Sequence, residues 1–356
     1  MFLRENTKKI KIGNLFIGGS DKITVQSMTN TDTRDAVSTV RQIRELEEAG
    51  CEIVRVAVPD MQAAESISRI VSEIHIPLVA DIHFDYRLAI ASIKNGADKI
   101  RINPGNMEKE EHIKAVIDCA KEYDIPIRVG VNSGSLPSSY PDKTAQSVVN
   151  GAKTQIDILE KYDFENIVVS LKCSDIETSY LSYKLFATKY NYPLHVGITE
   201  AGTIFAGTIK SCAGIGSILS LGIGNTIRVS LTGNPVEEIH VGRELLHSMN
   251  LGGNKKVSFI SCPSCGRCKI DLVSTANEIE QRLNDPNICK LIKKPITVAV
   301  MGCAVNGPGE AKHADIGLCG GNNEALLFEK GQIICKLNAS DMVEAFVKRV
   351  IEYAAE

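Results

Sequence analysis

The stretch from Glu52 to Asn103, EIVRVAVPDMQAAESISRIVSEIHIPLVADIHFDYRLAIASIKNGADKIRIN, carries the pattern that decides the fold. Three short runs rich in β-branched residues, EIVRVAV, PLVADIHF and DKIRIN, are separated by segments of helical periodicity that end near Ser72 and Asn95. Strands that alternate with helices are typical of a parallel sheet, because each helix returns the chain to the start of the next strand. The stretch therefore predicts consecutive β/α units.

The same pattern extends in both directions from this stretch. One further run precedes it, ITVQSM, and four follow it: IPIRVGVN, NIVVSLKCSD, YPLHVGITEAG and NTIRVSLTG. Eight units, the last helix ending near Met249, favour a closed (β/α)8 TIM-type barrel over an open doubly wound sheet. We assign the barrel to residues 1–250, with a short hairpin in KKIKIGNLFIGG before its first strand.

The pattern stops at LGGNKK, residues 251–256, whose glycines and charges predict a linker. Residues 257–356 then predict a smaller α+β domain. Its expected strands are VSFIS, PITVAVM and two short ones around ADIGL and QIICKL, and its expected helices run from Asp271 to Leu283 and onward from Asp341. One core can form in about a hundred residues, so the fold class is a barrel followed by a second small domain.

The composition is that of a soluble globular protein, with 44% hydrophobic and 23% charged residues among 356. Neither a membrane span nor a secretory or organelle targeting segment is visible, which predicts a cytoplasmic protein. Several of the eleven cysteines lie singly in apolar periodic segments, where a reduced thiol acts as a small hydrophobe. A net charge of −3 with mixed signs argues against a nucleic-acid-binding surface.

Charged residues occur in barrel strands that should be almost entirely apolar. Five are cations that we place near the carboxyl ends of their strands, where barrels of this kind hold their active sites: Arg55, Arg101, Arg128, Lys172 and Arg228. Other polar side chains are expected at the same rim: Gln26, Asp81, His83, Asn103, Asn132, His195, Glu200 and Ser230.

Any one of these cations could belong to a structural ion pair, but five of them outnumber the carboxylates at the strand ends. Unpaired buried cations are too unfavourable to persist without a counter-ion, and guanidinium geometry suits a phosphate. The sequence thus predicts a small ligand with at least two negative charges, most simply a diphosphate. For Glu200, proton transfer and a plain salt bridge both stay open.

A second constellation lies in SCPSCGRC, residues 261–268, which holds Cys262, Cys265 and Cys268. A fourth thiol, Cys303, follows in MGCAVNGPGE. Thiols at this spacing predict a soft-metal or redox site, with zinc, an iron–sulfur cluster, a disulfide and a redox dithiol as the candidates. Spacing alone groups all four cysteines as ferredoxin-like ligands.

The chain resembles a known family through motifs that run nearly from end to end: SMTNTDTRD, VRVAVP, ADIHFD, KIRINPGN, RVGVNSGSL, SLKCSD, GITEAG, IRVSL, SCPSCGR and GCAVNGPGE. It is similar to the short bacterial form of 4-hydroxy-3-methylbut-2-enyl diphosphate synthase, the iron–sulfur enzyme of the methylerythritol phosphate route to isoprenoids. No inserted middle domain is present, unlike in the longer plant-type form.

The resemblance implies a 4Fe-4S cluster bound by Cys262, Cys265, Cys303 and the carboxylate of Glu310, with Cys268 as a bystander. The tight turn expected in GPGE is able to bring Glu310 back to the metal. The implied substrate is 2-C-methyl-D-erythritol 2,4-cyclodiphosphate. The residues implied to bind it are Arg55, His83, Arg101, Arg128, Asn132, Lys172 and Asn306, with Glu200 handling a proton.

The resemblance also implies a homodimer, in which the cluster domain of one subunit covers the barrel mouth of the other, and a flavodoxin or ferredoxin as electron donor. Two other readings stay open. One is a phosphometabolite sensor with a structural zinc, which would be colourless where a cluster protein is brown. The other is a radical SAM barrel, although that class usually carries its clustered cysteines near the start of the barrel.

Overall fold

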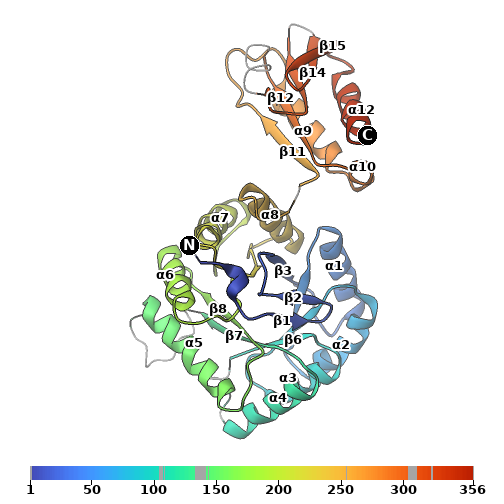
Figure 1. The fold of residues 1–356 in the computed structure, drawn as a ribbon. Helices are drawn as coiled ribbons and strands as arrows, with labels where there is room; N and C mark the ends of the chain where they lie inside the picture. The colour runs from blue at the N-terminus through green and yellow to red at the C-terminus, as the bar shows by residue number, and fades with distance from the viewer. Residues whose placement is uncertain are drawn as a thin grey trace. The chain divides into compact units, whose positions relative to one another are not determined.

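The computed structural model describes residues 2–103, 107, 109–132, 142, 144–253, 255–303, 311–321 and 324–355. The chain forms two compact units, Met1–Gly252 and Gly253–Glu356 (Figure 1). The division falls inside the segment that the sequence marks as a linker.

The first unit is built on eight parallel strands whose order around the sheet follows the chain. They are β3 (Thr24–Met28), β4 (Ile53–Ala57), β5 (Leu78–Asp81), β6 (Lys99–Ile102), β7 (Ile127–Asn132), β8 (Ile167–Lys172), β9 (His195–Val196) and β10 (Thr226–Ile227). β10 pairs with both β9 and β3, and a parallel bridge from Val169 to Leu194 joins β8 to the start of β9. The predicted (β/α)8 barrel is confirmed.

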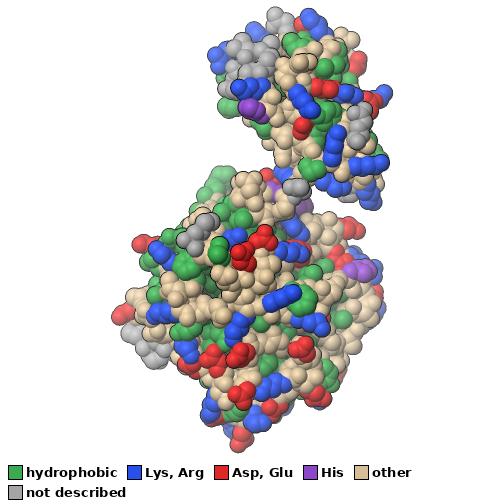
Figure 2. Space-filling view, in the orientation of Figure 1, with side chains coloured by type: hydrophobic (Ala, Val, Ile, Leu, Met, Phe, Trp, Pro, Cys, Tyr) green, Lys and Arg blue, Asp and Glu red, His purple; other side chains and the backbone are tan. Residues whose placement is uncertain are grey.

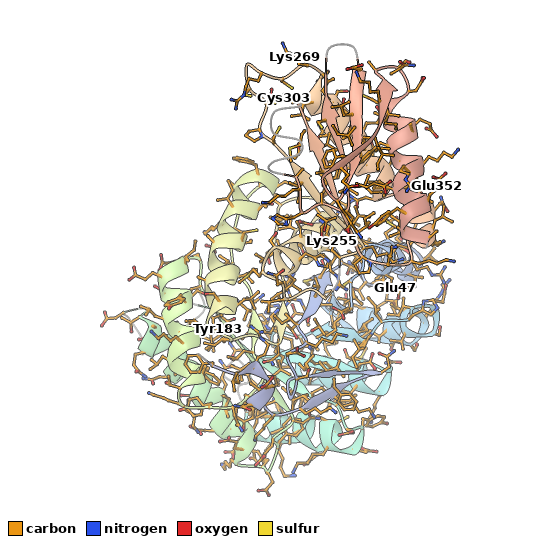
Figure 3. The ribbon with its side chains drawn as sticks, turned by 45° about the horizontal axis from the view of Figure 1, so that its top comes forward. Glu47, Tyr183, Lys255, Lys269, Cys303 and Glu352 are labelled. Carbon is orange, nitrogen blue, oxygen red and sulfur yellow. The ribbon has the colours of Figure 1, made fainter. Side chains whose placement is uncertain are left out.

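The seam between β8 and β9 has few ladder hydrogen bonds, and Tyr183 of α6 ties its two sides together. The Tyr183 hydroxyl donates to the carbonyl of His195 at 2.7 Å and accepts from the amide of Leu171 at 3.1 Å. This side chain is fully buried between its helix and the sheet (Figure 3). Its pKa is therefore raised by burial, so it stays a neutral hydrogen-bonding group.

In the described part of the chain, helices surround the strands, as Figure 1 shows. They are α1 (Ala36–Glu48), α2 (Met61–Glu73), α3 (Tyr86–Lys94), α4 (Glu110–Glu122), α5 (Ala145–Glu160), α6 (Ile176–Ala187), α7 (Ile204–Ser220) and α8 (Pro235–Ser248). Four of them begin behind an aspartate whose carboxylate accepts a backbone N–H of the first turn: Asp35, Asp60, Asp85 and Asp175. Each of these four caps sets the residue at which the loop after a strand ends and the next helix begins.

A hairpin closes the opposite end of the barrel. After a short 3-10 helix (Arg4–Asn6), β1 (Ile10–Ile12) and β2 (Leu15–Ile17) pair antiparallel around a turn in which Gly13 has a φ of +55°. The hairpin's isoleucines pack against the lowest inward-facing residues of the strands: Ile53, Val79 and Val168. The hairpin thus covers the amino-terminal end of the barrel, and we expect a ligand to enter at the carboxyl ends of the strands.

The second unit is a five-stranded sheet in the order β11-β12-β13-β14-β15 with helices packed against it. Its elements are β11 (Val257–Ser261), α9 (Leu272–Leu283), α10 (Pro286–Leu291), β12 (Ile296–Met301), β13 (Ile316–Gly320), β14 (Glu324–Glu329), β15 (Gln332–Asn338) and α12 (Met342–Ala355). β11, β12 and β13 are parallel, and the last two strands are antiparallel additions.

Two elements of this unit differ from the sequence-based expectation. The segment EALLFE, which was not predicted as a strand, forms β14 between the two expected ones, because a turn at Lys330 and Gly331 folds β15 back on it. The short helix α10 was also missed, although Asp285 caps it ahead of Pro286. In the described ranges, no helix is both long and apolar enough to cross a membrane.

Candidate active site

The open end of the barrel gathers charged side chains from neighbouring strands. Register places Asp81 of β5, Arg101 of β6 and Arg128 of β7 level with one another, and it places Arg55 of β4 level with Val79, one inward-facing position deeper. Over the visible outer face of this unit, by contrast, acidic and basic side chains are interspersed (Figure 2). The concentration of positive charge is therefore a property of the interior.

Asp81 is the carboxylate around which half of this cluster is arranged. Its oxygens lie 3.2 Å from Arg101 Nη1, 3.7 Å from Arg55 Nε and 3.7 Å from His83 Nε2. Burial by itself would raise the pKa of Asp81, but the Arg55 charge, the His83 hydrogen bond and the Arg101 charge together lower it far below its ordinary value. Asp81 is therefore ionised at all physiological pH values and fixes the two guanidinium groups.

A second carboxylate, Glu238 of α8, enters the barrel from the helix layer. It accepts the hydroxyl of Ser27 at 2.8 Å and the backbone N–H of Leu231 at 3.0 Å, and it lies 3.4 Å from Arg228. The Arg228 guanidinium is also 3.9 Å from the sulfur of Met28, whose sulfur lies 2.9 Å from Arg55. Arg228 is thus a paired, structural cation.

Three basic side chains lie beside these pairs, and no salt bridge joins them to a carboxylate within the described part of the chain: Lys99, Arg128 and Lys172. All three are buried, and Arg128 Nε and Nη1 and Lys99 Nζ have no hydrogen-bond partner there. Burial is the main reason why the pKa of each is well below its ordinary value, and the charges of neighbouring arginines add to it. A guanidinium keeps its proton at neutral pH even so, which leaves Arg128 as a buried charge that needs an anion.

Two glycines, Gly130 on β7 and Gly197 directly after β9, make room for this arrangement. A Cβ at Gly130 would lie 3.1 Å from Arg101 Nε, and one at Gly197 would lie 2.6 Å from the carbonyl oxygen of Arg228 and 2.8 Å from Lys172 Nζ. These distances are shorter than ordinary van der Waals contact, so a larger residue would displace the basic side chain or, at Gly197, also the backbone. The glycines in IRVGVN and HVGIT thus have a packing reason that the strand pattern did not reveal.

The positions of the predicted rim residues are only partly as expected. Lys172 ends β8, but Arg128 is the second residue of β7 and lies four residues before that strand's end. The expectation that every cation lies near the carboxyl end of its strand is therefore wrong for Arg128, because β7 runs on past the last residue of β6, although register still places Arg128 level with Arg101. Asn132 ends β7 and is half-buried, and the His83 side chain is 57% exposed beside Asp81.

Glu200 lies in the loop after β9 and is exposed. Its backbone has a φ of +54°, a left-handed conformation that non-glycine residues adopt rarely, and its carbonyl accepts a hydrogen bond from Lys210 at 3.2 Å. No ion pair of the Glu200 carboxylate occurs among the described residues. The plain salt bridge considered for it is thus not found there, and its proton-handling role stays a prediction.

Two residues of the site were missed by sequence reasoning. Lys99 precedes Arg101 by two positions on the same strand, so the alternation that placed Arg101 inside could have placed Lys99 inside as well. Glu238 could not have been found in this way, because it comes from a helix and reaches the interior only through the packing of α8 on β3.

Asp81→Asn should destabilise the barrel by about 3 kcal/mol, because it leaves Arg55 and Arg101 buried without their counter-ion. Denaturant unfolding followed by circular dichroism measures the effect. Asp118→Asn, which removes an exposed pair with Lys114, is the control and should change little. Equal stability of the two variants would mean that Asp81 does not hold the arginines.

The cysteines of the second unit lie at the carboxyl ends of adjacent parallel strands. Cys262 follows β11 directly and Cys303 follows β12 by two residues, while β11 and β12 are register neighbours. Figure 3 shows Cys303 and Lys269 at the same end of this sheet, where the Lys269 amide donates to the carbonyl of Gly302 at 2.9 Å. Cys262, Cys265, Cys268 and Cys303 together line one pocket of about 150 Å³.

Hydrogen bonding separates these thiols into two kinds. Cys262 Sγ accepts the backbone N–H of Gly302 at 3.4 Å, and the backbone N–H of Arg267, with its guanidinium, lowers the pKa of Cys265. The lowered pKa of Cys265 favours its thiolate, which is the form that binds metal. Cys268 instead donates its S–H to the carbonyl of Ile270 at 3.2 Å.

Only some of the four cluster ligands that the resemblance implies lie among the described residues. The residues in the described ranges do not bring three His, Cys, Asp or Glu side chains together at metal-binding distance. Glu310 and Asn306, which the resemblance places at the cluster and at the substrate, lie outside the described residues. Four cysteines around one pocket, with the pKa of Cys265 lowered, nevertheless fit an iron–sulfur cluster.

Comparison with known proteins agrees with both the charged barrel interior and the cysteine pocket. At 55% identity over 97% of this chain and 98% of the relative, the chain is similar to the 4-hydroxy-3-methylbut-2-en-1-yl diphosphate synthase (flavodoxin) of Clostridium perfringens. A relative of the same name from Caldanaerobacter subterraneus subsp. tengcongensis is 54% identical, over 99% of both chains.

Among solved structures, the dihydropteroate synthase of Yersinia pestis matches 68% of this chain and 98% of its own, with a TM-score of 0.52 and 12% identity. That likeness concerns the fold alone. Residues 7–243 match the family model of the GcpE TIM-barrel domain, and residues 258–352 match that of the GcpE protein C-terminal domain. The chain therefore belongs to the GcpE family.

Proposed function

We propose that this protein is an iron–sulfur oxidoreductase that converts 2-C-methyl-D-erythritol 2,4-cyclodiphosphate to 4-hydroxy-3-methylbut-2-enyl diphosphate in isoprenoid biosynthesis. The printed names of relatives more than half identical to it over nearly its whole length support the reaction. In the molecule itself, the proposal rests on the Arg128 guanidinium. It is buried inside the barrel, and its Nε and Nη1 have no hydrogen-bond partner among the described residues.

The cyclic diphosphate supplies the anion that this end of the barrel lacks. Its two phosphates carry one negative charge each, and no salt bridge joins the Arg128 guanidinium or the buried Lys172 amine to a described carboxylate. Arg55 and Arg101 complete the anchor, since Asp81 already orients them. His83, Asn132 and Asn306 would border the same ligand. Two parallel N–H···O bonds from one guanidinium to a phosphate would fix its orientation as well as its charge.

The reaction takes up two electrons and one proton and releases one water: substrate (−2) becomes product (−3) as the ring C–O bond breaks and a hydroxyl departs. Cys262, Cys265, Cys303 and Glu310 would hold a 4Fe-4S cluster, which when bound supplies the electrons one at a time and an iron open to an oxygen ligand. We assign Glu200 to proton handling, since its loop follows β9 at the open end and its strained backbone holds it in one conformation.

Cys268 and Glu310 are distinguished by substitution. Cys268→Ser should keep the cluster and most of the activity, because its thiol is turned to the Ile270 carbonyl. Glu310→Ala should keep a labile cluster with little turnover. Iron and sulfide content, read beside anaerobic activity, measures both. Loss of iron from Cys268→Ser with Glu310→Ala unaffected would contradict the carboxylate ligand.

We further propose that the protein acts as a homodimer in which one subunit's cluster domain covers the other's barrel mouth. The six-residue linker spans about 21 Å at most, and it starts at the sealed pole, because α8 runs antiparallel to β10. The 14 residues of α8 alone cover about 21 Å along the barrel. The mouth also presents exposed apolar side chains that suit a protein cover: Val37, Met61, Phe84, Ile204 and Phe205.

A flavodoxin is the electron donor that the relatives' printed name indicates, with a ferredoxin as the alternative. We place the protein in the cytoplasm, since all eleven of its cysteines are free thiols. The test of the proposed function is anaerobic turnover of the cyclic diphosphate with the brown, cluster-loaded protein and a chemical reductant. Formation of 4-hydroxy-3-methylbut-2-enyl diphosphate is expected. A colourless zinc protein that binds the substrate without turnover would instead indicate a sensor.

A further inference from the structure

A second polar layer lies inside the barrel, between the mouth cations and the hairpin that seals the other end. Its members are Gln26 of β3, Lys99 of β6 and His195 of β9, all with no exposed surface. Lys99 is the register neighbour of Val79, whose side chain packs on the hairpin. The layer is thus one step deeper than Arg101 and faces no solvent.

None of these three side chains has a hydrogen-bond partner among the described residues. Lys99 Nζ, both imidazole nitrogens of His195 and both amide atoms of Gln26 are buried and unsatisfied there. Buried polar atoms usually have a partner, so such a cluster needs a reason. No salt bridge joins Lys99 to a described carboxylate, and a charged ammonium in this place would be strongly unfavourable.

The groups that face Lys99 disfavour a charge on its amine in the ligand-free protein. Burial lowers its pKa most, followed by the charges of Arg128 on β7 and Arg55 on β4, while Asp98 opposes them weakly. Burial also lowers the pKa of His195 on β9 well below its ordinary value, and the Arg128 charge adds to this, so the imidazole is neutral. The hairpin side chains in the cluster below this layer are apolar, namely its isoleucines and Leu15.

We propose that Lys99 takes up one proton from solvent when the diphosphate enters the mouth, so that substrate binds together with a proton. This inference rests on the proposed function. The proton moves from the buffer to the Nζ lone pair, no other bond changes, and the added charge offsets part of the ligand's −2. Lys99 is then a positioning residue, which acts on the ligand through Arg128 and Arg55 rather than by contact.

The bound diphosphate is expected to raise the pKa of Lys99 enough to change its protonation. A unit negative charge brought to about 6 Å raises the pKa of an amine by about two units at an effective dielectric constant near 20. The ordinary pKa is 10.5 for Lys99 and 6.5 for His195. A bound anion that offsets the effect of burial therefore protonates Lys99 at neutral pH more readily than His195. Lys172 can take up a proton as well, and a difference measurement separates the two lysines.

The test is calorimetric titration of the cluster-loaded, unreduced protein with the cyclic diphosphate, in buffers of different ionisation enthalpy. Both phosphates of this ligand are strongly acidic, so its charge is constant near neutral pH and the buffer dependence counts protons on the protein. Wild-type uptake should exceed that of Lys99→Met by about half to one proton at pH 7.5. Lys94→Met, which changes an exposed lysine on α3, should match the wild type.

A second readout uses stability. The pKa of Lys99 is lower in the folded chain than in the unfolded chain, so wild-type stability should rise with pH relative to Lys99→Met as the pH increases toward the ordinary lysine pKa of 10.5. Lys99→Gln, which stays polar but cannot be charged, should behave like Lys99→Met in both measurements.

The outcomes separate the two proposals. Tight substrate binding with equal proton uptake in wild type, Lys99→Met and Lys99→Gln would overturn the role of Lys99 and leave the proposed function standing. No binding of the cyclic diphosphate to the cluster-loaded wild type would overturn the proposed function itself.

Discussion

Arg128→Met should weaken binding of the cyclic diphosphate by about a hundredfold or more while the barrel stays at least as stable as in the wild type. Two lost charge-assisted hydrogen bonds to a phosphate correspond to about 3 kcal/mol. Stability should not fall, because the substitution removes a buried charge without a carboxylate partner and keeps its apolar volume. Calorimetric titration gives the affinity, and thermal unfolding gives the stability.

Two matched variants sharpen this test. Arg41→Met, on the exposed face of α1, should bind substrate like the wild type. Arg101→Ala should weaken binding by a similar few kcal/mol but also lower stability, since Arg101 is paired with Asp81. Normal affinity in both Arg101→Ala and Arg128→Met would mean that the mouth cations are structural and that the substrate binds elsewhere.

Cys303→Ser should abolish both the cluster and measurable turnover. Cys303 is 6% exposed, lies two residues beyond the end of β12 and lines the same pocket as Cys262 and Cys265, and a serine hydroxyl is a poor ligand for soft metal. Iron and sulfide analysis with the charge-transfer colour measures the loss. Cys335→Ser, in an exposed thiol on β15, is the matched control and should keep the cluster.

The same variant tests the homodimer. Cys303→Ser and Arg128→Met are each expected to be inactive at substrate concentrations that saturate only the wild type, for different reasons and in different domains. Mixed dimers would contain one intact barrel opposite one intact cluster domain, so mixing the two proteins should restore part of the activity. No recovery after demonstrated subunit exchange would contradict the arrangement in which the domains work across subunits.

The sequence by itself was sufficient for the barrel and for most of the charged residues at its mouth. Strand and helix periods differ, and both are local properties, so eight alternations could be counted without coordinates. Arg55, Arg101 and Lys172 were recognisable because a charge in a doubly buried strand is out of place. The cysteine spacing predicted a metal or redox site, while the choice among its candidates came from family resemblance.

Only the tertiary structure decided which of these charges are satisfied. It pairs Arg228 with Glu238 and Arg101 with Asp81, and it leaves Arg128 and Lys99 without a carboxylate in the described part of the chain. Glu238 comes from α8, and no local sequence pattern shows that this helix brings the Glu238 carboxylate next to Arg228. Burial and neighbouring charge set the protonation of a lysine, and both depend on residues far apart in the chain. The neutral amine of Lys99 is therefore a property of the folded barrel, although the residue itself was visible in the sequence.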